Sequence, residues 1–337
     1  MSGETLLSYA DLSALNARIF IGAGCPPEVA RLLADNMALA EGDGALSHGL
    51  FRLDGLLASI RSGWVDPGAV PAIEDAAPGM LRADGRNGFS LPVLAAAREP
   101  LMEKARTCGI ALLSIRHGHH FSAVWPDIEP FARDGFLALA FINSMANVVP
   151  HGGRRRVYGT NPLGFAVPRA GRDPLVFDQA SSAMANGDVQ IAAREGNALP
   201  PGTGVDRDGN PTTDPKAVLE GGALLPFGGY KGSSIALMME VMGAALAGSA
   251  YSFEIDWSNY PGAATPPGGQ TYILIDPGRG APLPFGDRLE VLFDELRAAG
   301  VERLPSDRRY ANRRRAEREG IPVSAEALDR LRRLAGG

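Results

Sequence analysis

The first sixty residues place apolar side chains at the three- and four-residue intervals of amphipathic helices. Serine or proline stands at the start of each of these periodic segments, and both residue types favour the first positions of a helix. Glycine stands at the end of each segment, as is common at helix C-termini. The sequence therefore predicts a helical lobe whose three helices begin near Ser8, Pro27 and Ser47 and end near Gly22, Gly42 and Gly63.

The pattern changes after this lobe. Residues 64–90 are rich in Pro, Gly and Asp and are predicted as loops with one short strand at most. Residues 194–222 show little periodicity and are predicted as a long ordered loop, which is more often functional than idle. Short apolar runs predict strands at 110–115, 136–142, 163–167, 175–177 and 271–276. Periodic segments predict helices at 91–108, 122–134, 233–246, 288–299 and 323–334.

The composition is that of a globular enzyme. The chain has 337 residues, 45% hydrophobic and 21% charged, with a net charge of −5. That charge argues against nucleic acid or an anionic membrane as the main partner. No apolar run reaches the roughly 18 residues of a spanning helix, and the polar start does not resemble a secretory signal. Two cysteines are too few for a disulfide framework, so we expect a cytoplasmic protein.

His48 and Arg52 form the first candidate for chemistry. A single histidine is more often a packed or surface residue, and that alternative stays open. If a helix starts near Ser47, His48 and Arg52 share one face. A guanidinium beside an imidazole disfavours the charged imidazole, so the pair makes sense when an anion lies between them. Arg52 would then hold a carboxylate through two hydrogen bonds while His48 exchanges a proton.

The other four histidines lie in the stretch 116–168, among glycines and prolines that place polar groups at strand ends and turns. His117, His119 and His120 raise the alternative of a zinc hydrolase, since zinc sites use three protein ligands at short spacing. Alternating residues near a strand end point to opposite faces, which makes convergence of the three difficult. Histidines that bond to the backbone of a turn are the simpler interpretation, and we expect no metal.

No standard nucleotide fingerprint is present. Gly22-Ala23-Gly24 lacks the third glycine of the dinucleotide motif, and Lys231 is followed by glycine instead of the Ser or Thr of a phosphate loop. The loop Gly228–Gly232 could still present backbone N–H groups and Lys231 to a phosphate, or it could be a flexible helix start. The pair Arg308-Arg309 beside Ser306 could hold a ribose phosphate, or it could be a surface charge cluster.

Together these motifs resemble a known family, the malate/L-lactate dehydrogenase type of NAD(P)H oxidoreductases that does not use a Rossmann fold. The resemblance covers almost the whole chain. Its shared motifs are Ser47-His48-Gly49 with Arg52, His120-Phe121, Pro150-His151-Gly152, Gly159-Thr160-Asn161-Pro162, Asp178, Gly187-Asp188 and Gly228–Gly232. Longer strings at 119–127, 188–196 and 303–310 look like the branch that reduces Δ1-piperideine-2-carboxylate and Δ1-pyrroline-2-carboxylate.

The resemblance implies an α/β fold with a largely antiparallel, twisted sheet flanked by helices and a helical lobe built from both chain ends. We accordingly expect an N-terminal lobe at 1–115, a cofactor-binding sheet domain at 116–300 and a C-terminal segment at 301–337 that packs back on the first lobe. The family also implies a homodimer with its sites near the interface.

The same resemblance implies the site. NADPH is the expected cofactor, with NADH weaker. The implied cofactor-binding residues are His120, Phe121, Ser122, Ala123, Val124, Asp178, Gln179, Ala180, Lys231, Arg303, Leu304, Pro305, Ser306, Asp307, Arg308 and Arg309. Arg52 and Thr160 would bind the substrate, and His48 would donate a proton with the help of Ser47 and Asp188. Asn186 stands where that branch has a histidine, and Ser122 where a small apolar residue is usual.

The expected reaction is hydride transfer from NADPH to C2 of a cyclic 2-imino acid, giving L-pipecolate or L-proline. A 2-oxo acid dehydrogenase of the malate or lactate kind and an N-alkyl amino acid dehydrogenase are alternatives within the same family. The histidine-metal hydrolase is the alternative from another class.

Overall fold

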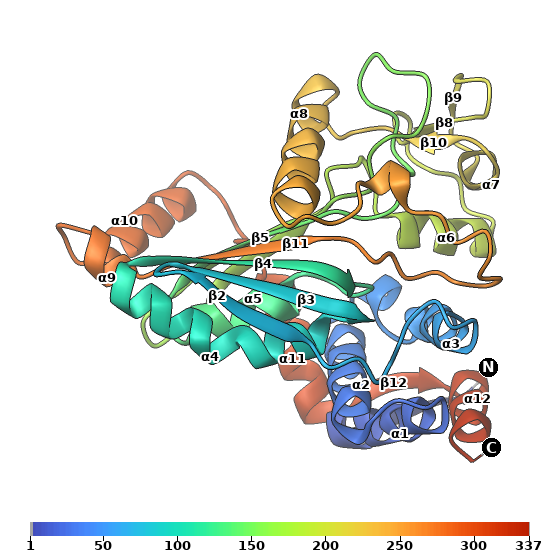
Figure 1. The fold of residues 1–337 in the computed structure, drawn as a ribbon, viewed down its shortest axis with the longest axis horizontal. Coiled ribbons are helices and arrows are strands. Elements are labelled where there is room, and N and C mark those ends of the chain that lie inside the picture. Colours follow the sequence, from blue (N-terminus) through green and yellow to red (C-terminus); the bar gives the residue numbers. More distant parts are fainter. Residues whose placement is uncertain (1–2, 337) are drawn as a thin grey trace.

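The computed structural model describes residues 3–336, and a seven-stranded sheet forms its centre (Figure 1). The strands, in spatial order, are β2 (Ala72–Ala77), β3 (Met80–Phe89), β4 (Ile110–His119), β11 (Gln270–Ile275), β5 (Leu137–Ile142), β6 (Leu163–Val167) and β7 (Leu175–Gln179). Only β3 and β4 run parallel; every other neighbouring pair in this sheet is antiparallel. The expected largely antiparallel sheet is therefore confirmed.

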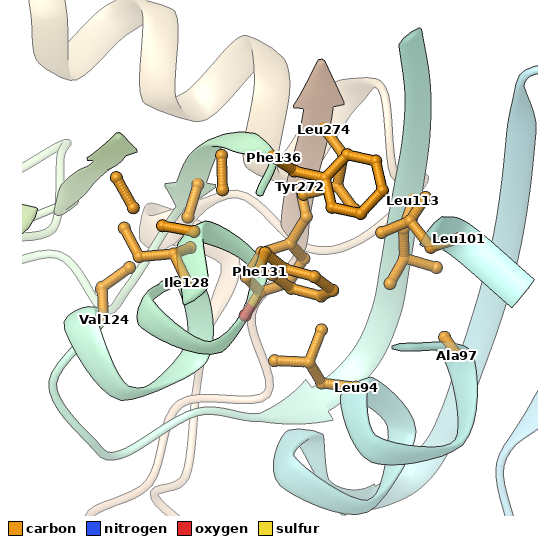
Figure 2. Packing of buried hydrophobic residues seen from close by; sticks show 14 of the residues in the cluster. Leu94, Ala97, Leu101, Leu113, Val124, Ile128, Phe131, Phe136, Tyr272 and Leu274 are labelled. Carbon is orange, nitrogen blue, oxygen red and sulfur yellow. The ribbon is translucent and has the colours of Figure 1, made fainter. Parts of the chain in front are cut away.

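Helices cover both faces of the sheet. The main apolar core lies between the sheet and helices α4 (Ser90–Cys108) and α5 (Trp125–Arg133). Figure 2 shows Leu101 and Phe131 from these helices packed against Leu113 and Tyr272 of the sheet. Figure 1 shows α8 (Tyr230–Met239) above the sheet, opposite α4, and it continues into the π-helical segment η3 (Glu240–Ala245). No helix within residues 3–336 is long and apolar enough to span a membrane.

Both chain ends build the helical lobe, as expected. Strand β1 (Glu4–Leu7) pairs antiparallel with β12 (Ile321–Ser324), so the two ends meet at one side of the molecule (Figure 1). The apolar faces of the helices and strands at both chain ends enclose a second hydrophobic core. The helices of this lobe are α1 (Tyr9–Gly22), α2 (Pro27–Gly42), α3 (Leu53–Arg61), α11 (Asp307–Glu319) and α12 (Ala325–Ala335). The short helix α9 (Pro277–Gly280) and the longer α10 (Phe285–Ala298) follow β11 at the far end of the sheet.

The prediction of loops at 64–90 is wrong, because β2 and β3 form an antiparallel hairpin there. Strand β3 contains two glycines and several charged residues, which hid its period of two from sequence reasoning. Its backbone is instead stabilised by hydrogen bonding to β4 along most of its length. The register shifts between Asp84 and Gly88, where Arg86 and Asn87 adopt positive φ angles of 50° and 65°.

The predicted loop at 194–222 is also largely wrong. Strands β8 (Gly204–Val205), β9 (Pro211–Thr212) and β10 (Ala223–Leu224) form a small antiparallel sheet beside α7 (Pro215–Leu219). With α6 (Asn186–Glu195), which the sequence analysis did not identify, they close over a small apolar cluster that includes Val189 and Leu224. Two-residue strands are too short to display a period, so no pattern could have revealed them.

Two further boundaries differ from expectation. The helix predicted from Ser122 begins only at Trp125, which leaves residues 120–124 as a loop over the sheet end. The helix expected to be capped by Ser47 is replaced by two short 3-10 turns, η1 (Leu46–His48) and η2 (Leu50–Arg52), ahead of α3. Another 3-10 turn, η4 (Ser252–Glu254), precedes β11.

A buried ion cluster fixes the C-terminal helix α11 to the rest of the molecule. Arg313 on α11 lies 2.6 Å from a carboxylate oxygen of Asp43 and 2.6 Å from one of Glu129. The side chains of Asp43 and Glu129 are only 0% and 6% exposed, and the Trp125 indole N–H also donates to Asp43. Burial raises the pKa of Asp43 in spite of this arginine. The cluster therefore joins the end of α2, helix α5 and α11.

Replacing this arginine should be costly. Arg313→Met would leave the buried Asp43 without a counter-ion and Glu129 with Arg133 alone, and we expect the free energy of unfolding to fall by about 3–5 kcal/mol in urea titrations. The neighbouring Arg314 makes an exposed ion pair with Asp173, so Arg314→Met is the matched control and should cost less than about 1 kcal/mol. Equal losses in the two variants would contradict a structural role for the cluster.

Candidate active site

A cavity of about 850 Å³ lies between the sheet end and the helical lobe. Its walls come from η1 and η2, the loop 120–124, the residues after β5 and β7, the first turn of α6 and the loop before α11. The volume is within the range of small-molecule and cofactor sites. The predicted residues that line it are Ser47, His48, Arg52, His120, Phe121, Ser122, Ala123, Val124, Thr160, Asp178, Gln179, Ala180, Asp188, Arg303, Leu304, Pro305, Ser306, Arg308 and Arg309.

Two predicted residues lie elsewhere. Lys231 is exposed in the first turn of α8 and does not line this cavity within residues 3–336. The carboxylate of Asp307 accepts a hydrogen bond from the Leu304 backbone N–H at 2.8 Å, so it shapes the turn before α11. That turn also needs Ser306 at a positive φ of 73°.

His48 and Arg52 face the same cavity, but not because one α-helix carries both. Gly49 separates their two 3-10 turns, with φ −91° and ψ −133°. The Glu41 carboxylate accepts from the Leu50 N–H at 2.8 Å and holds this chain reversal in place. His48 and Arg52 therefore do face the same cavity, but the prediction that a single α-helix places them there is wrong.

The imidazole of His48 is held by its neighbours. Its Nδ1 lies 3.1 Å from the Ser47 hydroxyl, and its ring meets the Trp125 ring edge-on with centroids 6.5 Å apart. Burial, then the positive charge of Arg52, then His120 lower the pKa of His48 to about 3. The resting form of His48 at neutral pH is therefore the uncharged imidazole.

Arg52 carries a charge that no carboxylate in residues 3–336 neutralises through a salt bridge. Its guanidinium lies 4.4 Å from the ring centroid of Phe121, and its buried Nε has no hydrogen-bond partner in the part of the chain that the structure describes. Burial lowers its pKa to about 10, and the nearby Asp188 opposes that shift. Gly187 makes the arrangement possible, because a Cβ there would lie 2.9 Å from an Arg52 nitrogen.

Asp188 was expected to help His48, but in the structure its electrostatic effect is on Arg52. It stands in the first turn of α6 and lines the cavity, yet its carboxylate makes no hydrogen bond to His48 among the described residues. Its electrostatic effect falls on Arg52. The ring of His48 is oriented by Ser47.

His120 belongs to a buried chain of polar groups. Its Nε2 lies 2.8 Å from the Asp127 carboxylate, which also accepts from the Tyr272 hydroxyl at 2.8 Å. Burial and this carboxylate raise the pKa of Tyr272. Because Asp127 anchors one ring nitrogen, the rest of the His120 ring is fixed at the cavity wall.

The three histidines of the zinc alternative each contact other groups in the structure. His117 is exposed beside Asp84 at 3.1 Å, and buried His119 bonds to Thr265 and Asn87. His120 is directed to Asp127 instead. No group of three or more His, Cys, Asp or Glu side chains in residues 3–336 is arranged to hold a metal ion.

Asp178, expected to bind cofactor, has a clear structural contact. Its carboxylate accepts from the backbone N–H groups of Val124 and Trp125 at 2.8 and 3.3 Å, at the N-terminus of α5. Burial raises its pKa, while Arg309 opposes the shift. The Arg309 guanidinium lies 4.2 Å from the Trp125 ring centroid. Asp178 therefore fixes the loop 120–124 that forms one wall of the cavity.

Sequence reasoning gave no role to several residues that line the cavity. Asn147 is the most informative, because it is 8% exposed and its buried side-chain oxygen has no hydrogen-bond partner among the described residues. Its amide therefore retains hydrogen-bonding capacity for a ligand. Asn143 and Ser144, immediately after β5, line the cavity too. Whether a buried amide lacks a hydrogen-bond partner depends on tertiary packing, so the sequence alone does not predict it.

Comparison with known proteins agrees with this architecture. Residues 7–332 match the family described as malate/L-lactate dehydrogenase. The chain is 55% identical to a Δ1-pyrroline-2-carboxylate/Δ1-piperideine-2-carboxylate reductase of Pseudomonas syringae pv. tomato, over 98% of this chain and 96% of that one. A reductase of the same name from Pseudomonas putida is 53% identical, over 97% and 96%.

The fold agrees equally well. The crystal structure of a Δ1-piperideine-2-carboxylate reductase from Pseudomonas syringae superposes with a TM-score of 0.96 at 54% identity, covering 98% of this chain and 99% of that one. These matches extend over the helical lobe, the sheet and every segment that lines the cavity. The chain belongs to the malate/L-lactate dehydrogenase family.

Proposed function

We propose that this protein is a nicotinamide-dependent reductase of cyclic 2-imino acids, such as Δ1-piperideine-2-carboxylate and Δ1-pyrroline-2-carboxylate. The observation that carries the proposal is the Arg52 guanidinium, which lies in the cavity without a salt bridge from any carboxylate in residues 3–336 and next to an uncharged His48. The names of relatives at 53–55% identity point to the same substrates.

Arg52 would bind the substrate carboxylate. A planar guanidinium and a carboxylate form two parallel hydrogen bonds, which fixes the direction of the acid as well as its position. Stacking on Phe121 restricts the guanidinium before the substrate arrives, and Thr160, which lines the same cavity, would contact the ring. Such preorganisation places C2 of the substrate in a reactive position at little entropic cost.

The uncharged state of His48 favours an imine over a ketone. A protonated imine brings its own proton, so the neutral imidazole can accept a hydrogen bond from the substrate N–H. Reduction of a 2-oxo acid instead creates an alkoxide that must be protonated, and the lowered pKa of His48 in the free enzyme leaves little cationic imidazole to supply that proton. The proton-donor role expected from the sequence thus becomes, in our proposal, the role of an acceptor that holds the iminium.

The cavity fits a nicotinamide dinucleotide, which when bound supplies the hydride. Arg303 and Arg308 are exposed at its rim and make no salt bridge among the described residues, so they are free to bind phosphate. Their presence beside Ser306 supports a preference for NADPH over NADH. Asn147 and the fixed His120 ring provide polar groups deeper in the same cavity.

We also propose that the enzyme is a homodimer that acts in the cytoplasm. Large apolar side chains on α8 and η3 remain exposed, among them Leu237 at 53% and Val241 at 49%. Exposed apolar patches of this kind mark association surfaces.

An assay of nicotinamide absorbance tests the function directly. We expect kcat/KM for Δ1-piperideine-2-carboxylate or Δ1-pyrroline-2-carboxylate to exceed that for pyruvate and oxaloacetate by on the order of 100-fold, because only the imines arrive protonated. NADPH should be preferred to NADH. Addition of methylamine to pyruvate tests the N-alkyl amino acid alternative, and faster turnover of oxo acids than of imino acids would refute the proposal.

Two substitutions separate the proposed roles. Arg52→Met should lower kcat/KM by on the order of 100-fold, because it removes two charge-assisted hydrogen bonds, while unfolding stability is retained because an unpaired buried charge is removed. His48→Ala should lower kcat/KM by about 10–100-fold, the value of one hydrogen bond to a charged group. A variant of either kind that keeps most wild-type activity would remove that residue from the mechanism.

The charge of His48 can be followed by NMR of its ring signals, assigned with the His48→Asn variant. We expect the signals of the free enzyme to stay constant from pH 8 to pH 5, because the lowered pKa of about 3 keeps the ring neutral throughout. A bound carboxylate next to Arg52 should raise that pKa, since it offsets the guanidinium charge. Titration of the free enzyme with a midpoint near 6.5 would contradict the assigned environment.

A further inference from the structure

A second cavity, of about 530 Å³, is also lined by Arg52. It is formed by residues 51–55 below and by α6 and α7 above, two parts that lie at the same end of the molecule in Figure 1. Arg52, Phe121, Met145 and Asn186 line both cavities. The proposed carboxylate-binding arginine therefore borders both cavities.

The second cavity has its own cations. Arg194, in the last turn of α6, lies with its guanidinium 4.5 Å from the ring centroid of Phe51. The guanidinium of Arg52 is 6.0 Å from the centroid of the same ring. Lys216 on α7 is exposed in the same wall. Neither Arg194 nor Lys216 forms a salt bridge among residues 3–336.

The acidic groups of this cavity do not balance these cations. Asp54 is engaged in an ion pair with Arg330, which leaves Glu220 as the other carboxylate in the lining. Three cations, Arg52, Arg194 and Lys216, thus face the cavity of a protein whose net charge is −5. A local positive field on an acidic protein attracts small anions to that one place.

We propose that the second cavity is the entrance and outer binding site for the carboxylate substrate. Arg194 and Lys216 attract the anion and pass it to Arg52, while the nucleotide fills the first cavity from the opposite side. The inference rests on the proposed function and adds a separate route for the acid. If the acid enters through this second cavity, exchange of substrate and product needs no release of the nucleotide.

The rate of anion association tests this route. The probe is pyrrole-2-carboxylate, a planar ring acid that accepts no hydride, mixed with the enzyme–NADPH complex in a stopped-flow fluorimeter. We expect the double variant Arg194→Glu/Lys216→Glu to reduce the association rate constant on the order of tenfold at low salt, with the difference narrowing at about 0.5 M salt as screening removes steering. The NADPH dissociation constant should stay within about twofold of wild type.

Arg18→Glu is the matched control, because Arg18 is an exposed arginine on α1 that lines neither cavity and makes no salt bridge within residues 3–336. It should leave the association rate unchanged. Equal association rates in the double variant and wild type would overturn the proposal, and so would a loss in NADPH affinity as large as the loss in anion association. The assay measures binding without turnover, so a failure of imino acid reduction in the wild type is detected separately.

Discussion

The arrangement of the site depends on one buried charge, the guanidinium of Arg52, which forms no salt bridge among residues 3–336. It lies against Phe121, its buried Nε has no hydrogen-bond partner among these residues, and burial lowers its pKa to about 10 although Asp188 opposes the shift. A desolvated cation without a salt bridge destabilises the empty protein, and a carboxylate that binds there offsets this cost. The same charge helps to keep His48 neutral, so one side chain sets both the anion affinity and the protonation state next to it.

The fold holds this charge in place by joining segments that are distant in the sequence. The sheet supplies the loops after β5 and β7, while both chain ends supply the helical lobe that carries η1, η2 and the loop before α11. Arg313 locks α11 to α2 and α5 through two buried carboxylates. Asp178 fixes the loop 120–124 through the N-terminus of α5. Rigid supports of this kind let short irregular segments carry the chemistry.

Sequence reasoning succeeded where local signals and long motifs exist. Ser8 caps α1 by accepting from the Asp11 N–H, and Gly109, with a φ of 80°, ends α4, the helix predicted at 91–108. Sequence reasoning failed for β3, whose stability comes from pairing with β4, and for the two-residue strands near α7. It brought His48 and Arg52 together through a helix that does not exist there. The unsatisfied amide of Asn147 and the second cavity arise from tertiary packing, so no sequence pattern contains them.

A crystal structure of the ternary complex with NADPH and pyrrole-2-carboxylate would test the central claim most directly. The account predicts a carboxylate bound to the Arg52 guanidinium by two hydrogen bonds of about 2.7–2.9 Å, with the ring nitrogen of the acid within hydrogen-bond distance of His48. It also predicts the reduced nicotinamide on the side of the first cavity. A carboxylate bound to other cations, with Arg52 still unpaired, would contradict the account.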